Sequence, residues 1–460
     1  MSSPLRPLHV LLVSAPLQGH VNPLLVLGRR LASRGLLVTF STVPSAGLKF
    51  SHGGSEAIGV GRGTLRFEHL HLHMHGGAAL RDETNDDMMR HHQDAAPAAL
   101  AGLIRRHADA GRPVSCVVAS AYTPWALRVA TGMRLPHAVL WTESCAVLSL
   151  YYHYFHSLAA AFPGEPSPSA PVAVPGLPPL AAGDLPALIH APEHFFWRQL
   201  LAADLRSIRE TVSWVLVNTF DELEHAAIEA LSVHLPLVPV GPLIDTENNH
   251  GGRRDDDDDA VAWLDLQPPR SVVFVAFGSL LKLRGDEMAE LAEGLAATGR
   301  PFLWVVRDDN RETLPEDRLA AATGSGGSSG KVVAWCEQGP VLSHRAVGCF
   351  VTHCGWNSAT EALAAGVPVV AYPGWSDQPT NAKFLTDVYG VGVRLPKPLA
   401  REAVRRSLEE VMVGPDAEAM RERAGEWKVK ATAAMADGGS SDGGTQDFVD
   451  AVLSRAGNGY

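Results

Sequence analysis

The sequence predicts an α/β protein with two doubly wound domains, each a parallel sheet covered by helices, that face each other across a cleft. The chain has 460 residues, which is longer than the chains that usually fold around a single hydrophobic core. Short apolar runs alternate with helical patterns in two successive series, as in parallel sheets. A polar, highly charged segment separates the two series. We therefore expect a first domain over residues 1–244, a linker over 245–260 and a second domain over 261–440.

The first domain opens with a strand, a helix and a second strand. The strands are expected over His9–Ala15 and Leu36–Phe40. Pro23 suits the first turn of the helix, and Gly35 follows its end. The polar stretch Gln18–Pro23 is expected to be a loop before the helix, and His20 lies in it. The apolar positions of the helix follow helical spacing: Leu24, Leu25, Leu27 and Leu31.

Three more apolar runs continue the first domain. They are expected as strands over Val114–Ala119, Ala138–Trp141 and Val215–Val217. A proline-rich stretch, 163–186, is expected to be a surface loop. The segment "NTFDELEHAAIEAL" follows the last strand and predicts a helix.

The second domain begins with the buried strand in "SVVFVAFGS", which leads into Ser279 and a helix from about Gly285. Ligands of doubly wound folds bind at the carboxyl ends of the strands, which is where the loops holding His20 and Ser279 fall. A flexible loop is expected at 324–329. The remaining strands are expected over Phe302–Val306, Lys331–Ala334, Cys349–Thr352 and Val367–Ala371.

Composition and charge limit the partners. The chain is 46% hydrophobic and 19% charged, which fits a well-packed soluble protein. Its net charge of −11 argues against nucleic acid or an anionic membrane surface as a partner, so a small ligand is expected. The five cysteines lack paired zinc-site spacing and suggest reduced thiols in the cytoplasm. We expect no signal peptide and no membrane span.

Two other runs suggest a metal site at first sight. Contiguous carboxylates such as Asp255–Asp259 are usually solvated. In "HLHLHMH", His69, His71, His73 and His75 alternate with apolar residues, so they share one strand face at about 6.8 Å spacing. That spacing suits at most a pair of ligands, and a polar face is the simpler explanation. We therefore expect no functional metal site.

The most informative stretch is Trp335–Gln378. At its centre, a strand runs into the turn His353–Asn357 and then a helix beginning near Ser358. A helix N-terminus after a parallel strand is suited to a diphosphate. Spacing alone favours a plainer role, a capping box in which Glu361 closes the helix start. No GxGxxG motif is present, so a dinucleotide cofactor is poorly supported.

This 44-residue stretch, taken whole, resembles without a gap the signature box of plant secondary-product UDP-glycosyltransferases. The resemblance extends to the Gln-Gly-His loop, "NTFDELE" and "VGPL", and so covers essentially the full chain. It implies the GT-B fold of two Rossmann-like domains, with a C-terminal helix at about 441–460 that joins the first domain. It also implies transfer of a sugar from a UDP-sugar with inversion, without a metal or other cofactor.

The resemblance assigns the nucleotide contacts residue by residue. Trp335 is expected to stack on uracil, because an indole offers a flat apolar face. Gln338 and Glu361 are expected to bind the ribose hydroxyls. Hydrogen-bond donors around the diphosphate would stabilise the leaving group without a cation. The residues of that group are Ser279, His353, Asn357 and Ser358, with Trp356 in the same turn.

The sugar contacts follow in the same way. Asp377 and Gln378, with Trp356, are expected to bind the sugar hydroxyls, and Gly19 and Thr142 are assigned to the same subsite. The closing glutamine is the residue usual for glucose in the family, whereas galactose users tend to have histidine there. We therefore expect UDP-glucose as the co-substrate. Glu337 replaces the family's usual proline and is expected to change loop stiffness alone.

By resemblance, His20 is the general base that takes a proton from the acceptor, a task suited to an imidazole with an ordinary pKa near 6.5. A histidine that only caps its helix is the alternative. The family's aspartate partner is missing, because Ser120 stands at that position in "VVASAYTPW". A serine can orient the ring but cannot offset an imidazolium charge. Glu143 in "WTESC" is a substitute partner or a helix-start residue.

The missing aspartate bears on the acceptor. A carboxylic acid is already ionised at neutral pH and needs no base, and a protonated His20 would attract and orient it. "GLLVTFST" and "PGWSDQPTNAKFLTDV" resemble the plant subgroup that makes 1-O-glucose esters of aromatic acids. Neighbouring subgroups glucosylate phenols, alcohols and thiols, so these acceptors remain an alternative. The loops expected to form the acceptor pocket, such as 75–95 and 150–200, do not identify the acceptor.

Two alternatives to a transferase stay open. A catalytically silent UDP-sugar-binding protein would keep the box and show no turnover, although the intact His20 argues against it. A nonhydrolysing epimerase of the same fold would need acid–base residues at the sugar, which the sequence does not offer. We expect a monomer.

Overall fold

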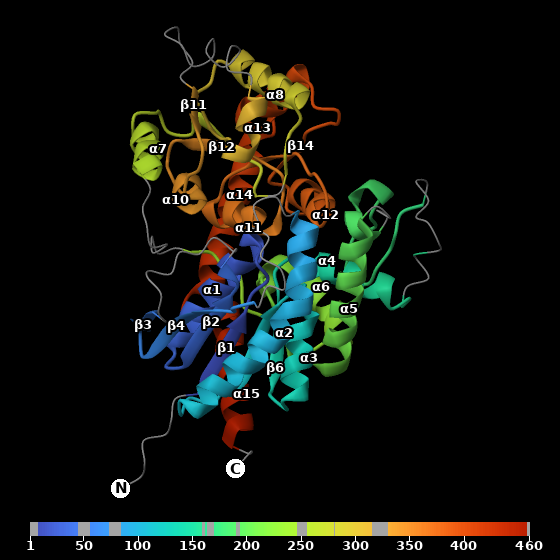
Figure 1. The fold of residues 1–460 in the computed structure, drawn as a ribbon. Coiled ribbons are helices and arrows are strands. Elements are labelled where there is room, and N and C mark those ends of the chain that lie inside the picture. Colours follow the sequence, from blue (N-terminus) through green and yellow to red (C-terminus); the bar gives the residue numbers. More distant parts are fainter. Residues whose placement is uncertain are drawn as a thin grey trace. The chain divides into compact units, whose positions relative to one another are not determined.

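The computed structural model describes residues 8–44, 56–72, 84–158, 162, 170–189, 194–245, 255–279, 281–314 and 330–457, which form two compact units (Figure 1). Unit 1 comprises Met1–Pro179, Leu188–Leu243 and Ala434–Tyr460. Unit 2 comprises Leu180–Ala187 and Ile244–Ala433. The division differs from the expected limits at Leu180–Ala187, which groups with unit 2.

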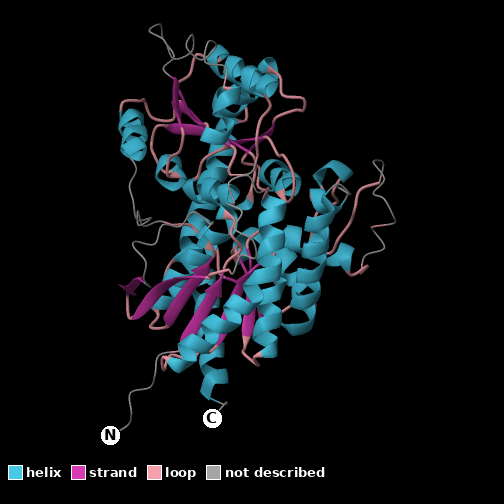
Figure 2. Cartoon of the chain, in the orientation of Figure 1, coloured by secondary structure: helices cyan, strands magenta, loops and turns pink. Residues whose placement is uncertain are grey.

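Unit 1 is built on an eight-stranded sheet with the order β3-β4-β2-β1-β5-β6-β7-β8 (Figure 2). All neighbouring strands are parallel except β3 and β4, which form an antiparallel pair at the edge. The strands are β1 (His9–Val13), β2 (Leu37–Thr42), β3 (Glu56–Val60), β4 (Gly63–His69), β5 (Cys116–Ser120), β6 (His137–Trp141), β7 (Trp214–Val217) and β8 (Leu237–Pro239).

The central strands of unit 1 are buried on both faces. Every residue of β1, β5, β6 and β7 is buried, which explains why they read as continuous apolar runs. The helices are α1 (Gln18–Ser33), α2 (Asn85–Asp109), α3 (Pro124–Gly132), α4 (Cys145–Phe155), α5 (Phe195–Thr211), α6 (Asp221–Ser232) and α15 (Ser440–Gly457).

Two expectations about the first half of unit 1 were wrong. Helix α1 begins at Gln18, so His20 lies in its first turn and not in a loop. Pro23 lies inside the helix, where the missing N–H costs one backbone hydrogen bond. Strand β4 ends at His69, so the alternating histidines do not continue it through His71. His73 and His75 lie outside the described residues.

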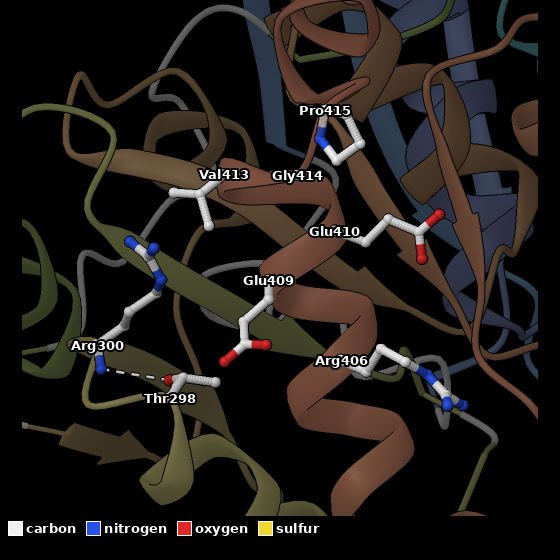
Figure 3. A pocket seen from close by; sticks show the side chains of 8 residues that line it. All are labelled: Thr298, Arg300, Arg406, Glu409, Glu410, Val413, Gly414 and Pro415. Atoms are coloured by element: carbon white, nitrogen blue, oxygen red, sulfur yellow. Dashed lines mark hydrogen bonds between the residues drawn. The ribbon is translucent and has the colours of Figure 1, made fainter.

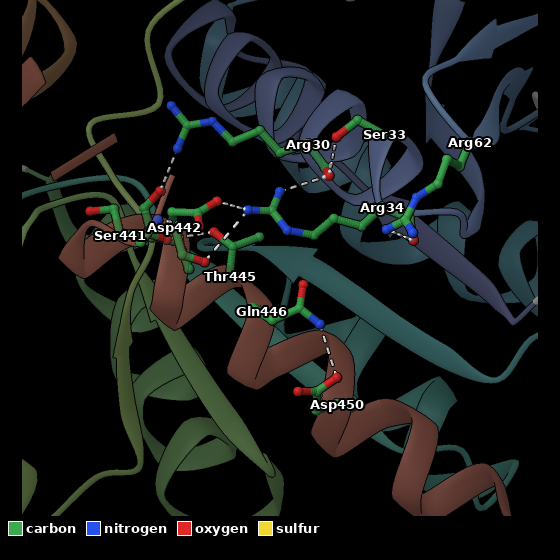
Figure 4. Close-up of polar contacts among 11 residues, drawn as sticks. Arg30, Ser33, Arg34, Arg62, Ser441, Asp442, Thr445, Gln446 and Asp450 are labelled. Carbon is green, nitrogen blue, oxygen red and sulfur yellow. Dashed lines mark hydrogen bonds and ion pairs between the residues drawn. The ribbon is translucent and has the colours of Figure 1, made fainter. Parts of the chain in front are cut away.

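The last helix completes unit 1 (Figure 4). Arg34, the C-cap residue of α1, forms an ion pair with Asp442 of α15, and Ser441 donates a hydrogen bond to the carbonyl of Gly241. Phe448 packs edge-on against Trp214 of β7, with ring centroids 5.4 Å apart. Helix α15 therefore contributes to the core of unit 1, although the sequence of unit 2 precedes it.

Unit 2 is built on a six-stranded, fully parallel sheet with the order β11-β10-β9-β12-β13-β14. Its strands are β9 (Val272–Ala276), β10 (Phe302–Val305), β11 (Gly330–Val333), β12 (Val347–Thr352), β13 (Val369–Ala371) and β14 (Gly392–Arg394). Its helices are α7 (Asp255–Asp265), α8 (Gly285–Ala297), α10 (Gln338–Leu342), α11 (Trp356–Ala365), α12 (Gln378–Lys383), α13 (Arg401–Val413) and α14 (Ala417–Met435), the last reaching into unit 1.

Helix α7 begins inside the expected linker, because Asp255–Asp259 form its first turns. Asp259 forms an ion pair with Lys331. The loop at 324–329 lies outside the described residues.

Within the described ranges, no group of three or more His, Cys, Asp or Glu side chains could hold a metal ion. No helix in the same ranges is long and apolar enough to cross a membrane. The five cysteines are buried and form no disulfide bonds.

Candidate active site

His20 is buried in the first turn of α1, where its Nδ1 lies 3.3 Å from Oγ1 of Thr142. The ring of Tyr122 packs edge-on against the imidazole, with centroids 5.6 Å apart. Burial lowers the pKa of His20 to about 4. An imidazole with this pKa is neutral at pH 7, which differs from the expected protonated His20 that attracts a carboxylate.

Ser120 ends strand β5 and bonds to backbone. Its hydroxyl accepts a hydrogen bond from the Ala15 N–H at 2.9 Å and donates to the Ala121 carbonyl at 3.3 Å. These bonds fix the start of the loop that leads into α1. The hydroxyl that contacts His20 is that of Thr142, which follows β6.

Glu143 is linked to His20 through Tyr122. The Tyr122 hydroxyl donates to Oε1 of Glu143 at 3.2 Å, while the Tyr122 ring contacts the imidazole. The backbone of Tyr122 has a φ of +64° and donates to the buried carboxylate of Asp204 at 2.7 Å. Burial raises the pKa of Asp204 to about 7. Asp204 thus fixes the loop that sets the Tyr122 ring against His20.

Glu224, from the "NTFDELE" segment, fixes the loop that carries Thr142. Its buried carboxylate accepts hydrogen bonds from the N–H groups of Cys145 and Ala146, at 2.9 and 2.8 Å. These groups open helix α4 and have no partner inside the helix. The segment therefore positions the stretch between β6 and α4.

In unit 2, the predicted diphosphate turn joins β12 to α11. Helix α11 begins at Trp356, two residues earlier than expected, and its N-cap is Gly355 without a side-chain cap. The capping-box interpretation of Ser358 and Glu361 was therefore wrong. The N–H groups of this first turn suit an anionic ligand.

Gln338 forms hydrogen bonds to Ser358 and Glu361, the two residues that were expected to form a capping box. Its amide nitrogen donates to Oγ of Ser358 at 2.9 Å and to Oε2 of Glu361 at 2.5 Å. Burial raises the pKa of Glu361 to about 7, and the bond from Gln338 opposes this. Three residues assigned to the nucleotide thus form one hydrogen-bonded group.

His353 is enclosed by two glycines. A Cβ atom at Gly278 or at Gly355 would lie 2.5 Å from Nε2 of the imidazole, so only glycine leaves room for the ring. Gly278 also has a φ of +66°, which suits glycine. Burial lowers the pKa of His353 to about 4, so the ring is neutral at pH 7. Ser279 follows Gly278, and its carbonyl accepts from the Arg307 guanidinium.

The other nucleotide residues lie on neighbouring segments of unit 2. Trp335 lies between β11 and α10 and is partly exposed. Asn357 lies in the first turn of α11 and is also partly exposed. Glu337, which replaces the usual proline, is the N-cap residue of α10.

Asp377 and Gln378 lie at the start of α12. The Asp377 carboxylate accepts from the Asn381 amide at 2.6 Å, and burial raises its pKa to about 6 despite hydrogen bonds that include one from the Trp356 backbone. Oε1 of Gln378 accepts from the N–H groups of Gly374 and Trp375, at 2.8 and 3.2 Å. Because its oxygen is used in this turn, any hydrogen bond from Gln378 to a ligand would come from its NH₂ group.

A pocket of about 400 Å³ elsewhere in unit 2 is a different feature (Figure 3). It lies between Arg300 and the end of α13, and charged side chains such as Arg406 and Glu409 line it. None of its lining residues belongs to Trp335–Gln378. It is not the predicted nucleotide site.

Comparison with known families identifies the chain. The family model described as "UDP-glucoronosyl and UDP-glucosyl transferase" matches residues 187–422, which include the whole Trp335–Gln378 box. The chain belongs to this family. It is thus a UDP-glycosyltransferase, as its sequence predicts.

Curated members of the UDP-glycosyltransferase family match over nearly the whole chain. The gallate 1-beta-glucosyltransferase 84A24 of Punica granatum is 41% identical over 97% of this chain and 89% of its own length. The cinnamate beta-D-glucosyltransferase of Fragaria ananassa is 38% identical over 96% of this chain and 82% of its own.

Solved structures of UDP-glycosyltransferases share the fold. Os79 of O. sativa, in complex with U2F and trichothecene, has a TM-score of 0.83 and 32% identity, and the match covers 96% of this chain and all of Os79. A Polygonum tinctorium UDP-glucosyltransferase capable of glucosylating indoxyl has a TM-score of 0.81 and 27% identity, over 98% of this chain and all of its own. The expected GT-B fold is confirmed.

Sequence reasoning missed three residues that position this UDP-glycosyltransferase site. Glu224 lies in a quoted segment, but nothing in the sequence shows that its carboxylate caps another helix. Tyr122 lies two residues beyond Ser120 and was read only as part of a strand end. Asp204 lies on α5, where a single aspartate on an amphipathic helix gives no indication of burial.

Proposed function

We propose that this UDP-glycosyltransferase moves glucose from UDP-glucose to a small aromatic carboxylic acid with inversion, giving a 1-O-glucose ester. The observation that carries the proposal is the contact of His20 with the neutral hydroxyl of Thr142. Relatives whose names specify gallate and cinnamate support the same acceptor class. A buried, neutral imidazole without a carboxylate partner suits an acceptor that arrives already ionised.

The reaction needs no proton removal. A carboxylate oxygen attacks the anomeric carbon, a new C–O bond forms, and the bond from that carbon to the diphosphate oxygen breaks. The electron pair leaves with UDP, and the attacking oxygen carried no proton at neutral pH. In this proposal His20 orients the acceptor by hydrogen bonding and acts as a base only for acceptors that carry a proton.

The donor residues act on the leaving group and on the glucose. His353, Ser279, Ser358 and Asn357, with the N–H groups at the start of α11, would bind the diphosphate as negative charge develops on it. Trp335, Gln338 and Glu361 would hold the nucleoside, and Asp377 and Gln378 would bind the glucose hydroxyls, with Gly19 and Thr142 at the same subsite. We propose that this set of donors suffices without a metal ion or other cofactor.

Phenols, alcohols and thiols are the second acceptor class. Solved relatives support it, since one is bound to a trichothecene and another glucosylates indoxyl. For these acceptors a buried His20 with a lowered pKa would be a weak base. We also propose that the protein works as a cytoplasmic monomer.

A panel experiment tests the proposal. Purified protein is incubated with UDP-glucose and matched aromatic acids, phenols and thiols, and products are measured by mass spectrometry before and after mild alkali. The expected result is alkali-labile glucosides from the acids. Alkali-stable glucosides from phenols alone would overturn the ester assignment. Tight UDP binding without any product would favour a silent UDP-sugar-binding protein.

A further inference from the structure

The segment Leu180–Ala187, here called the strap, belongs to unit 2 although it lies between two stretches of unit 1. The sequence predicts that most of it is a surface loop. In the structure it contains a 3₁₀ turn, Ala182–Asp184, and the side chains of Leu180 and Leu185 are buried. It therefore packs as a fixed part of the unit.

The strap forms a hydrogen bond at each end of the turn that carries Asp377 and Gln378, the predicted sugar-binding residues. Before Asp377 and Gln378, the Ala187 N–H donates to the carbonyl of Ser376 at 2.8 Å. After them, Oγ1 of Thr380 donates to the carbonyl of Asp184 at 2.7 Å. Ser376 has a φ of +57°, a conformation that is unfavourable for serine and needs such support.

An ion pair anchors the strap to the sheet of unit 2. Nη1 of Arg394, the last residue of β14, lies 2.6 Å from Oδ1 of Asp184. Nη2 of Arg394 donates to the Gly183 carbonyl at 3.3 Å. The Asp184 residue is only 8% exposed, so its carboxylate depends on this partner.

We propose that Asp184 and Arg394 are positioning residues for the donor sugar. The strap, tied to β14 by this pair, fixes the turn 376–380, and the turn presents Asp377 and Gln378 to the glucose hydroxyls. The inference rests on the proposed use of UDP-glucose. It adds that residues far from the signature box in sequence determine how well the sugar, but not the nucleotide, is bound.

Binding measurements test the inference directly. The dissociation constants of UDP-glucose and UDP are measured by calorimetry for the full-length protein and for Asp184→Asn and Arg394→Gln. The expected result is about a tenfold weaker binding of UDP-glucose, equivalent to one lost sugar hydrogen bond, and unchanged binding of UDP. The KM for UDP-glucose should rise by the same factor with little change in kcat.

A charge exchange separates positioning from general destabilisation. Combining Asp184→Arg with Arg394→Asp rebuilds the pair in reverse and should restore at least part of the UDP-glucose affinity. Glu290→Gln, which breaks an ion pair with Arg401 between α8 and α13, is the matched control and should leave both affinities unchanged. Thermal unfolding verifies that each variant is folded.

The outcomes are distinguishable. Equal weakening of UDP and UDP-glucose, or no weakening of either, would overturn the positioning role. If the wild type binds UDP-glucose more tightly than UDP yet glucosylates no acceptor, the proposed function fails while the binding comparison still decides the role of the strap.

Discussion

Nδ1 of His20 lies 3.3 Å from Oγ1 of Thr142. A hydroxyl can fix the orientation of an imidazole, but it offers no charge to stabilise an imidazolium. The pair therefore combines an oriented ring with a lowered pKa, which suits an acceptor that needs no deprotonation.

The pH dependence of the reaction follows from this pair. Burial lowers the pKa of His20 to about 4, so the ring is protonated only below that pH. For an aromatic acid at saturating UDP-glucose, kcat/KM should be flat between pH 6 and pH 8 and should show no step near 6.5. Steady-state kinetics across this range test it. A step near 6.5 that disappears in His20→Gln would show that His20 titrates in its ordinary range.

Ser120 should prove structural. Ser120→Ala removes the acceptor of the buried Ala15 N–H, so the free energy of unfolding should fall by about 1–3 kcal/mol. Urea unfolding measures this change. Ser33→Ala, which removes an exposed hydroxyl on α1, is the control and should change stability by less than about 0.5 kcal/mol. A folded Ser120→Ala whose kcat falls a hundredfold would instead point to a direct role in catalysis.

The space around His353 can be tested with two glycines of nearly equal φ. Gly278→Ala and Gly299→Ala both place alanine at a φ near +65°, which costs about 1–2 kcal/mol. Only at Gly278 would the new methyl group meet His353, at 2.5 Å, whereas nothing lies within 4 Å at Gly299. We expect kcat to fall about 100-fold in Gly278→Ala alone, by loss of a leaving-group donor. Equal activity in the two variants would contradict this function of His353.

UDP-glucose binding should strengthen with rising pH. Burial raises the pKa of Glu361 to about 7, and only the ionised carboxylate accepts both ribose hydroxyls. Binding must therefore release a proton below pH 7, and affinity should rise about tenfold between pH 6 and pH 8. Calorimetry measures this affinity with UDP-glucose, which lacks the titrating terminal phosphate of UDP.

Glu361→Gln should flatten the pH dependence of UDP-glucose affinity, apart from a smaller step due to Asp377, whose pKa burial raises to about 6. If the pH dependence of UDP-glucose affinity were unchanged in Glu361→Gln, the group that loses the proton would be a residue other than Glu361.

Much of the fold was predictable because its strands are continuous apolar runs. β9 and β12 run into polar turns where the sequence places them, and α8 begins at Gly285 as expected. The edge hairpin of β3 and β4 was missed, although Leu65 and Phe67 of β4 alternate with the charged Arg66 and Glu68. Helix α1 was started too late, because Pro23 was taken to mark its first turn.

The sequence names the residues of the candidate site but does not give their contacts. Local spacing alone made Ser358 and Glu361 a capping box, whereas the structure joins both to Gln338, twenty or more residues earlier in the chain. Ser120 was compared with the aspartate it replaces, but the hydroxyl that reaches His20 comes from another strand, at Thr142. Such contacts depend on which strand ends are adjacent in the sheet, and periodicity does not carry that information.

The C-terminal helix imposes an order on biosynthesis. Phe448, Val449 and Val452 belong to the same core cluster as Val10, and all of unit 2 is translated between them. A ribosome emits the chain from its N-terminus, so unit 1 lacks these three side chains until residues 448–452 have been synthesised. The unit made first is therefore completed after unit 2, and a nascent chain that stops before these residues carries a first unit with an open core.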